Sequence, residues 1–214
     1  IGTGVFGSLG FQLLDIHTGF SILFIWLAGG IIAFCGALCY SELAAALPRS
    51  GSEYHYLSKI YHPSIGFLSG WVSLTVGFAA PVALSAMLLG GYVNKVFPDA
   101  NAELLALTVV AGLTAIHCTS IKTGSAFQNI FTLLKILLIL IIIFSGIAFT
   151  EHQSISFMPS ADAWKEIPTL GFAGALYWVS YSYSGWNASS YIAGEIENPQ
   201  RNVPRSLLTG TFVV

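Results

Sequence analysis

The sequence predicts an all-α integral membrane protein, and three observations support this class. Hydrophobic residues make up 55% of the 214 residues and charged residues only 8%, whereas ordinary soluble domains carry about 25% charged residues. The mean hydropathy is +0.74. Apolar runs long enough to cross a bilayer, which takes about 20 residues, follow one another along most of the chain. The formal net charge of -2 gives no basic surface of the kind that binds nucleic acid.

The apolar runs predict a single transmembrane domain that is truncated at both ends. A partial first segment covers residues 1–14. The expected spans that follow lie at residues 20–44, 65–96, 103–118, 126–150 and 167–193, and a seventh begins near residue 204. The connection from Leu47 to Pro63 is polar and aromatic, and residues 97–101 read as a tight turn. Neither connection is expected to form a separate domain.

The basic residues predict how these segments are oriented. Arg49, Lys59, Lys122, Arg201 and Arg205 fall in connections on one side, against Lys95 and Lys165 on the other. Because cytoplasmic loops carry an excess of Lys and Arg, the larger group is expected to face the cytoplasm of a multi-pass cell-membrane protein. The first segment then runs outward and the sixth runs inward.

Two small, polar stretches interrupt apolar segments: Gly2-Thr3-Gly4 in the first and Ser182-Tyr183-Ser184-Gly185 in the sixth. Since hydrocarbon cannot bond freed backbone groups, such breaks occur where protein or an aqueous cavity satisfies them. In secondary transporters they lie near the midplane and face the solute. The two segments run in opposite directions and would each open a five-helix repeat, as an inverted-topology repeat requires. The alternative is close helix packing by small residues, which does not need the hydrogen-bonding groups present here.

Four stretches carry a resemblance to a known family. Residues 1–8, IGTGVFGS, resemble the first-helix signature of the amino acid-polyamine-organocation (APC) superfamily. Residues 181–205, YSYSGWNASSYIAGEIENPQRNVPR, resemble the sixth helix and following loop of its L-type amino acid transporter branch. Residues 127–135, FQNIFTLLK, are similar to that branch's fifth helix, and residues 40–54 contain a fourth match. The resemblance implies a LeuT-type fold of two inverted five-helix repeats (5+5), of which this chain covers the first repeat and the start of the second.

The two breaks are expected to bind the backbone part of an amino acid. A half-helix beginning after Gly4 would point unpaired N–H groups and a positive dipole end at a carboxylate. The sixth-segment break would offer carbonyls to the ammonium group. Tyr181 also matches the family's aromatic gate, and Ser184 stands where glycine is common, which narrows the pocket. The substrate-binding positions implied by the resemblance are Gly2, Thr3, Gly4, Tyr181, Ser184, Gly185 and Asn187.

Lys135 is the ionisable residue expected well inside a span. It shares a helical face with Gln128, Thr132 and Ser145, as expected for a face turned to the bundle interior, and intramembrane charges often mark ion pathways. The alternative is a lysine whose ammonium group reaches the lipid interface. In the family, a lysine here stands where sodium-coupled relatives hold their cation, which implies transport without sodium.

The sequence therefore indicates a sodium-independent secondary transporter of amino acids, acting in the bilayer as an exchanger or with proton coupling. A polyamine or other organocation permease of the same fold is one alternative. A permease-like sensor that binds an amino acid without moving it is another. An enzyme is not expected, because paired intramembrane carboxylates or a nucleophile with its base are not visible in the sequence.

No cofactor, metal or disulfide-linked partner is expected. The histidines are scattered over different segments without metal-ligand spacing; they are His17, His55, His62, His117 and His152. The turn from Lys95 to Glu103 contains no cysteine. Heteromeric members of the family use a cysteine there to bond an accessory glycoprotein, so this chain is expected to lack that covalent subunit.

Overall fold

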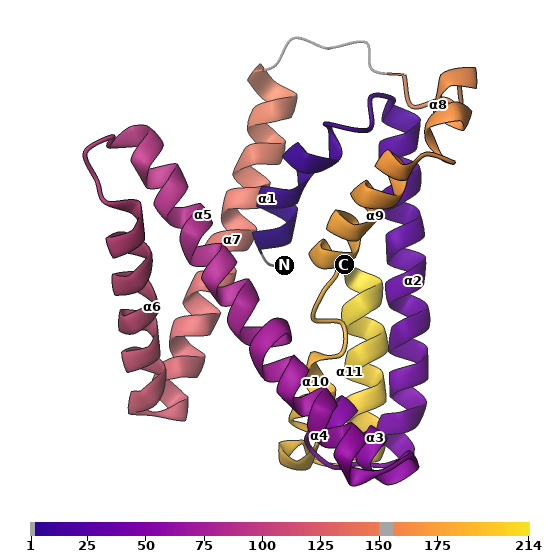
Figure 1. Cartoon of the computed structure of the whole chain (residues 1–214), viewed down its shortest axis with the longest axis vertical. Coiled ribbons are helices and arrows are strands. Elements are labelled where there is room, and N and C mark those ends of the chain that lie inside the picture. The colour runs from indigo at the N-terminus through magenta and orange to yellow at the C-terminus, as the bar shows by residue number, and fades with distance from the viewer. Residues whose placement is uncertain (1–2, 150–155) are drawn as a thin grey trace. The chain divides into compact units, whose positions relative to one another are not determined.

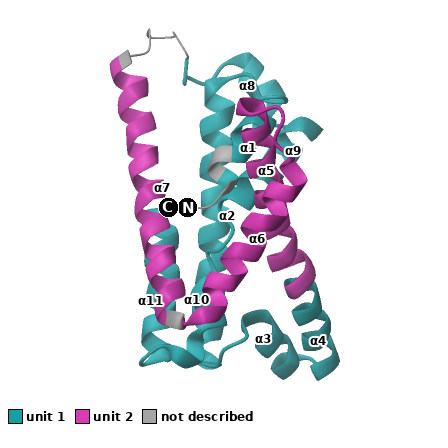
Figure 2. Ribbon diagram, turned by 90° about the vertical axis from the view of Figure 1, so that its left-hand side faces the viewer, with its two compact units in different colours: residues 1–73, 155–214 teal, residues 74–154 magenta. Residues whose placement is uncertain are grey.

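The computed structural model describes residues 3–149 and 156–214, and the regular structure within these ranges is entirely helical (Figure 1). The chain divides into two compact units, shown in different colours in Figure 2: residues 1–73 with 155–214, and residues 74–154. Four helices of the described ranges are long and apolar enough to cross a membrane: Gly19–Ala46, Pro63–Val96, Ala102–Thr119 and Lys122–Ala148.

The first unit is organised around α2 (Gly19–Ala46), against which α9 (Leu170–Ser182) and α11 (Pro199–Val213) pack. Helix α1 (Thr3–Gln12) packs on α9. One face of α2 is buried at steps of four residues and consists mainly of small side chains: Ser21, Ile25, Gly29, Ala33, Ala37 and Ser41. Small residues let helix backbones approach closely, which is how helices associate in membranes.

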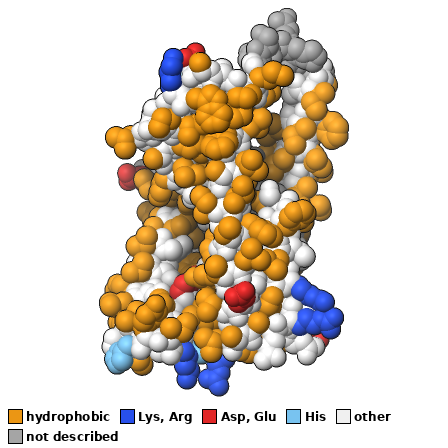
Figure 3. Space-filling view, turned by 90° about the vertical axis from the view of Figure 1, so that its right-hand side faces the viewer, with side chains coloured by type: hydrophobic (Ala, Val, Ile, Leu, Met, Phe, Trp, Pro, Cys, Tyr) orange, Lys and Arg blue, Asp and Glu red, His pale blue; other side chains and the backbone are white. Residues whose placement is uncertain are grey.

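The opposite face of α2 is apolar and exposed. Leu23, Leu27 and Ile31 are each more than half exposed, at 53%, 63% and 56%. On the face drawn in Figure 3, hydrophobic side chains cover much of the surface, and Lys and Arg side chains gather toward its ends. A soluble domain rarely exposes so large an apolar area, whereas lipid covers it at no cost.

Hydrogen bonds join α8 to the start of α2 at one end of the first unit. Short helix α8 (Ala161–Glu166) ends in Glu166, whose carboxylate accepts from the Thr18 hydroxyl at 2.7 Å and from the His17 backbone N–H at 3.2 Å. Thr18 is also the N-cap of α2. Burial alone would raise the pKa of Glu166, but hydrogen bonds from Thr18, Ser21 and His17 hold that pKa below its ordinary value.

At the other end of α2 lie α3 (Ser52–Ile60), α4 (Pro63–Val72), α10 (Ala188–Tyr191) and a 3-10 turn at Ala193–Glu195 (Figure 1). Helix α11 begins at Pro199, earlier than the start expected near Pro204. The reason is local: Asn198 adopts a left-handed conformation (φ 48°) that ends the preceding loop. Proline suits the first helical position because its missing N–H would be unpaired there.

The second unit contains α5 (Ala80–Val96), α6 (Ala102–Thr119) and α7 (Ile121–Phe149), with α6 packed on both neighbours. Asn94 closes the turn between α5 and α6 by donating to the carbonyls of Pro98 and Ala100, at 3.3 and 2.8 Å. Asn101 caps α6 by accepting from the backbone N–H of Leu104 at 3.0 Å.

The span expected at residues 65–96 contains a π-helical turn, Ser73–Ala79, which the apolar pattern did not indicate. Pro81 is the second residue of α5, two positions after this turn ends at Ala79. Proline lacks the N–H that an α-helix requires in its interior. Wider turns of this kind are one of the ways in which a helix accommodates the loss of that hydrogen bond.

Candidate functional site

Helix α9 ends at Ser182, the first residue of the predicted break Ser182-Tyr183-Ser184-Gly185. Residues 183–187 form turns, and helical structure resumes only at Ala188. Gly185 has φ +97°, a left-handed conformation that glycine adopts without the steric cost of a side chain. The sixth segment is therefore a broken helix in this structure.

The first segment meets this break directly. A Cβ atom added to Gly4 would lie 2.6 Å from the Ser182 Cα atom and 3.1 Å from its backbone nitrogen. Further along the helices, the Phe11 and Trp178 rings stack with centroids 4.6 Å apart. These contacts make α1 and α9 antiparallel, so the N-terminal end of α1 lies beside the C-terminal end of α9. Opposite ends of two helix dipoles thus meet at one place.

A buried polar chain holds the two ends together. The Ser8 and Ser182 hydroxyls are 2.8 Å apart, and Gln12 donates from Nε2 to the Ser8 Oγ at 3.1 Å. The Gln12 Oε1 accepts from the Trp26 indole N–H at 3.0 Å. Ser8 and Gln12 are 2% and 0% exposed. This polar chain was not predicted, although two polar residues four apart in an apolar segment are a signal for it.

Tyr183, the first residue after α9, is anchored on α2. Its hydroxyl donates to the Trp26 carbonyl at 3.3 Å, and its ring lies beside the Trp26 ring with centroids 5.8 Å apart. A Cβ atom at Gly30 would lie 3.1 Å from the Tyr183 hydroxyl oxygen. The small residues of α2 therefore leave the space that this aromatic side chain fills.

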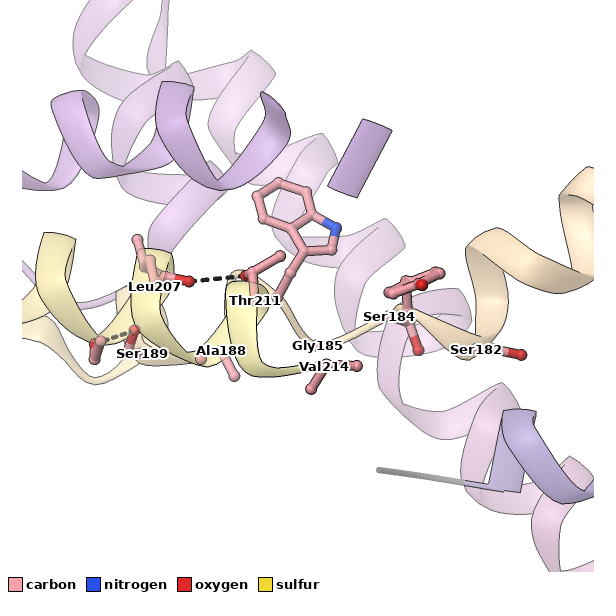
Figure 4. Close-up of a pocket in the computed structure, with 12 residues that line it drawn as sticks. Ser182, Ser184, Gly185, Ala188, Ser189, Leu207, Thr211 and Val214 are labelled. Atoms are coloured by element: carbon pink, nitrogen blue, oxygen red, sulfur yellow. Dashed lines mark hydrogen bonds between the residues drawn. The ribbon is translucent and has the colours of Figure 1, made fainter. Parts of the chain in front are cut away.

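A pocket of about 320 Å³ opens between the break and α11 (Figure 4). Ser184 and Gly185 lie in the non-helical stretch on one side, and Thr211 and Val214 lie at the end of α11 on the other. The volume is at the lower end of the range of about 300–1,000 Å³ typical of small-molecule sites. The lining residues are Ser182, Tyr183, Ser184, Gly185, Trp186, Ala188, Ser189, Ser206, Leu207, Gly210, Thr211 and Val214.

The residues contributed by α11 were not predicted as site residues. Ser206 donates to Ser189 across the pocket wall at 2.8 Å, and Thr211 donates to the Leu207 carbonyl at 2.8 Å. The apolar pattern predicted a seventh segment but did not indicate which face of its helix, α11, would contact the break. Only the packing of α11 on α2 and α10 brings these hydroxyl groups to the pocket.

The predicted substrate residues do not all come together. Ser184 and Gly185 line the pocket, and Gly4 is buried against Ser182. Gly2 lies outside the described residues, and Thr3 is the first residue of α1.

Tyr181 and Asn187 are not among the pocket-lining residues. The Tyr181 carbonyl accepts from the Ser184 N–H at 3.1 Å, and the Asn187 amide donates to Glu53 at 2.6 Å. The Tyr181 carbonyl thus already accepts one hydrogen bond, although its second lone pair can accept another donor. The Asn187 side chain donates instead to Glu53 on α3 and to the Tyr191 hydroxyl on α10.

Lys135 lies on α7 in the second unit and is half-buried. Thr132, one turn earlier, donates to the Gln128 carbonyl at 2.8 Å, and both side chains are exposed. Lys135 and its helical face remain predictions as a coupling site. Within the described residues, no group of three or more His, Cys, Asp or Glu side chains is arranged to hold a metal ion.

Comparison with known proteins decides the family. A family model described as "Amino acid permease" matches residues 1–214. The chain belongs to the amino acid permease family. Similar curated proteins include the b(0,+)-type amino acid transporter 1 of Mus musculus, 32% identical over 220 residues, and that of Homo sapiens, 31% identical over 220 residues. Each alignment covers 100% of this chain and 45% of the relative.

A second similar permease is the large neutral amino acids transporter small subunit 2 of Mus musculus, 31% identical over 216 residues, which covers 97% of this chain and 41% of that protein. The chain thus spans less than half the length of these relatives. The resemblance to the L-type branch of the APC superfamily is confirmed, as is the all-α fold class. As a permease with several apolar helices, the protein is a multi-pass membrane protein.

Proposed function

We propose that this permease is a sodium-independent secondary transporter of amino acids that works by alternating access around its broken first and sixth helices. One observation carries the proposal: the N-terminal end of α1 lies against the C-terminal end of α9, with Gly4 at Ser182. The first N–H groups of a helix lack intrahelical partners and suit a carboxylate, and the last carbonyls of a helix, which can accept further donors, suit an ammonium. An α-amino acid carries both groups on one carbon atom.

The pocket beside these helix ends supports a substrate of modest size. Ser184 and Gly185 form its wall at the break, so a substrate side chain placed there would meet the Ser184 hydroxymethyl group. The similar proteins are named as transporters of amino acids, one of them of large neutral amino acids. We expect this chain to take neutral amino acids and to favour small over large side chains, because serine at position 184 narrows the pocket.

Lys135 is the proposed coupling residue. A lysine ammonium placed where sodium-coupled relatives hold their cation would supply a positive charge there, so sodium would not be required. Exchange of one amino acid for another, or coupling to protons, would then drive transport. The basic loops with Arg49, Lys59, Lys122, Arg201 and Arg205 are proposed to face the cytoplasm.

A covalently attached subunit is not part of this proposal. One similar protein is named a small subunit. The turn between α5 and α6 of this chain contains no cysteine, however. The cysteines of the described ranges lie on α2 and α6, as Cys35, Cys39 and Cys118, and are not in disulfides.

Uptake by the purified full-length protein in liposomes tests the proposal. Vesicles loaded with unlabelled alanine should accumulate external radiolabelled alanine without sodium, either by exchange or when a proton gradient replaces the internal alanine. Leucine and phenylalanine should compete less well than alanine. Uptake that requires sodium would refute the coupling, and competition by putrescine but not by amino acids would favour an organocation permease. Saturable alanine binding without uptake under any gradient would indicate a sensor.

A further inference from the structure

Glu53 is a half-buried carboxylate that the proposed binding site does not use. It lies in the first turn of α3, where its Oε1 accepts from the Tyr40 hydroxyl at 2.9 Å and from the Asn187 side-chain amide at 2.6 Å. Tyr40 belongs to α2, and Asn187 precedes α10. One oxygen atom thus joins the neighbouring helices α2 and α3 to a segment that lies 134 positions further along the chain.

The same region carries further bonds between the segment that follows the break and the residues around the start of α3. The Ser52 and Ser190 hydroxyls are 2.7 Å apart, and both residues are 0% exposed. The Gly51 N–H donates to the Tyr191 carbonyl at 3.2 Å, and the Gly194 N–H donates to the Ser50 hydroxyl at 2.9 Å. The segment from residue 187 to 195 is therefore bound along its length to this loop.

Glu53 is ionised at neutral pH in this setting. Burial alone would raise its pKa, but hydrogen bonds from its own backbone N–H and from Tyr191, Tyr40 and Ser52 hold the pKa below its ordinary value. Hydrogen bonds to a charged acceptor are about twice as strong as those between neutral groups. An ionised carboxylate only accepts hydrogen bonds, so the donor groups around Glu53 all point toward its oxygen atoms.

The position of Asn187 decides what this cluster can do for the pocket. Only residues 183–186 lie between the end of α9 and Asn187, and they include Ser184 and Gly185 of the pocket wall. These residues are not helical, so their conformation depends on how the two ends of the stretch are held. Ser182 is held by α1, as described above, and Asn187 is held by Glu53.

Trp186 adds packing to the second anchor. Its ring meets the Tyr40 ring edge-on with centroids 4.8 Å apart, and a Cβ atom at Gly36 would lie 3.0 Å from it. Tyr40 thus contacts both Glu53 and the residue next to the pocket turn. The hydrogen-bonded anchor and the aromatic contact act on neighbouring residues from the same side.

We propose that Glu53 is a positioning residue: its carboxylate holds Asn187 against α2 and α3 and thereby fixes the Ser184–Gly185 turn that lines the pocket. The inference rests on the proposed function only in taking this pocket as the substrate site. Glu42 serves as the control position, because it is an exposed carboxylate near the end of α2 that makes no such hydrogen bonds within the described residues.

Hydrogen exchange of the full-length protein tests the anchor without a substrate. Glu53→Gln keeps an acceptor but removes the charge, and loss of hydrogen bonds to a charged group should speed exchange in a peptide covering residues 183–195 by about ten-fold or more. Exchange in α9 and α11 should change little, and Glu42→Gln should leave all three regions as they were. Unchanged exchange of residues 183–195 in Glu53→Gln would overturn the proposal. Equal acceleration throughout the protein would reduce Glu53 to a general structural role and overturn it as well.

A charge swap supplies the second readout. Asn187→Asp alone places two carboxylates together, whereas Glu53→Gln with Asn187→Asp restores one amide and one carboxylate. Each single variant should raise the KM for alanine about ten-fold with little change in maximal rate, and the swapped pair should recover most of the affinity. A swap no better than the single variants would contradict the pairing. If the parent protein takes up no amino acid while hydrogen exchange in Glu53→Gln changes as expected, that result would refute the proposed transport function but would support the positioning role of Glu53.

Discussion

Replacement of Gly4 by alanine should separate the two helix ends that the proposed site requires. The added Cβ atom would lie 2.6 Å from the Ser182 Cα atom, 3.0 Å from its Oγ and 3.1 Å from its backbone nitrogen. Two of these three atoms belong to the backbone and cannot rotate away. Helix α1 must therefore shift away from α9 if a methyl group is to fit.

The expected cost follows from this geometry. Adding a methyl group to a tightly packed site costs about 1–3 kcal/mol. Replacing a helical glycine by alanine returns at most about 1 kcal/mol through helix propensity. Subtracting the full return leaves a net loss of stability of up to about 2 kcal/mol, and each 1 kcal/mol lowers Tm by about 2–4 °C for a chain of about 150–250 residues. Substrate affinity should fall at least about ten-fold, because carboxylate and ammonium contacts come from helix ends that no longer meet.

Gly10 provides the matched control. It lies on the same helix, and a Cβ atom there would meet nothing within 4 Å. Gly10→Ala should leave alanine affinity unchanged and raise Tm slightly, by the helix propensity alone. Thermal unfolding and equilibrium binding of radiolabelled alanine, measured on the parent and both variants, compare the two positions. If Gly4→Ala matches Gly10→Ala in both measurements, the close approach of α1 and α9 does not form part of the site.

Three further predictions concern other residues. Ser184→Gly should widen the pocket and improve competition by leucine and phenylalanine against alanine uptake; an unchanged rank order, with expression intact, would place Ser184 outside the substrate pocket. Lys135→Ala should either abolish amino acid exchange at every pH or remove the pH dependence of uptake. Near-normal transport at all pH values without sodium would instead indicate that the Lys135 ammonium group lies at the lipid interface. Gln12→Leu should lower the free energy of unfolding by about 1–3 kcal/mol, because the Trp26 indole N–H loses its acceptor and the buried Ser8 hydroxyl keeps only its bond with Ser182. Chemical or thermal unfolding measures that loss, and an unchanged midpoint would show that the polar chain is not stabilising.

Much of the architecture could be predicted from the sequence because hydropathy and helix breakers act locally. Four of the apolar runs correspond to helices of at least 18 residues, and the run at residues 167–193 contains the shorter helix α9, which ends where small and polar residues begin. The end of α9 at Ser182 follows from the run of serine and glycine after it. The π-helical turn before Pro81 was not predicted, because it depends on how one long helix accommodates a missing N–H and leaves no mark in the apolar pattern.

The sequence by itself determined the class, the apolar helices and the end of α9, since hydropathy and helix-breaking residues act within each segment. The tertiary structure alone decided which breaks and polar groups meet. Ser8 and Ser182 are separated by 174 positions and Glu53 and Asn187 by 134 positions. Contacts at such separations depend on how α1 packs on α9 and how α9 and α11 pack on α2, where the small buried residues of α2 set the distance between helices. No local propensity encodes that distance, so the anchor at Glu53 emerged only when the helices were assembled.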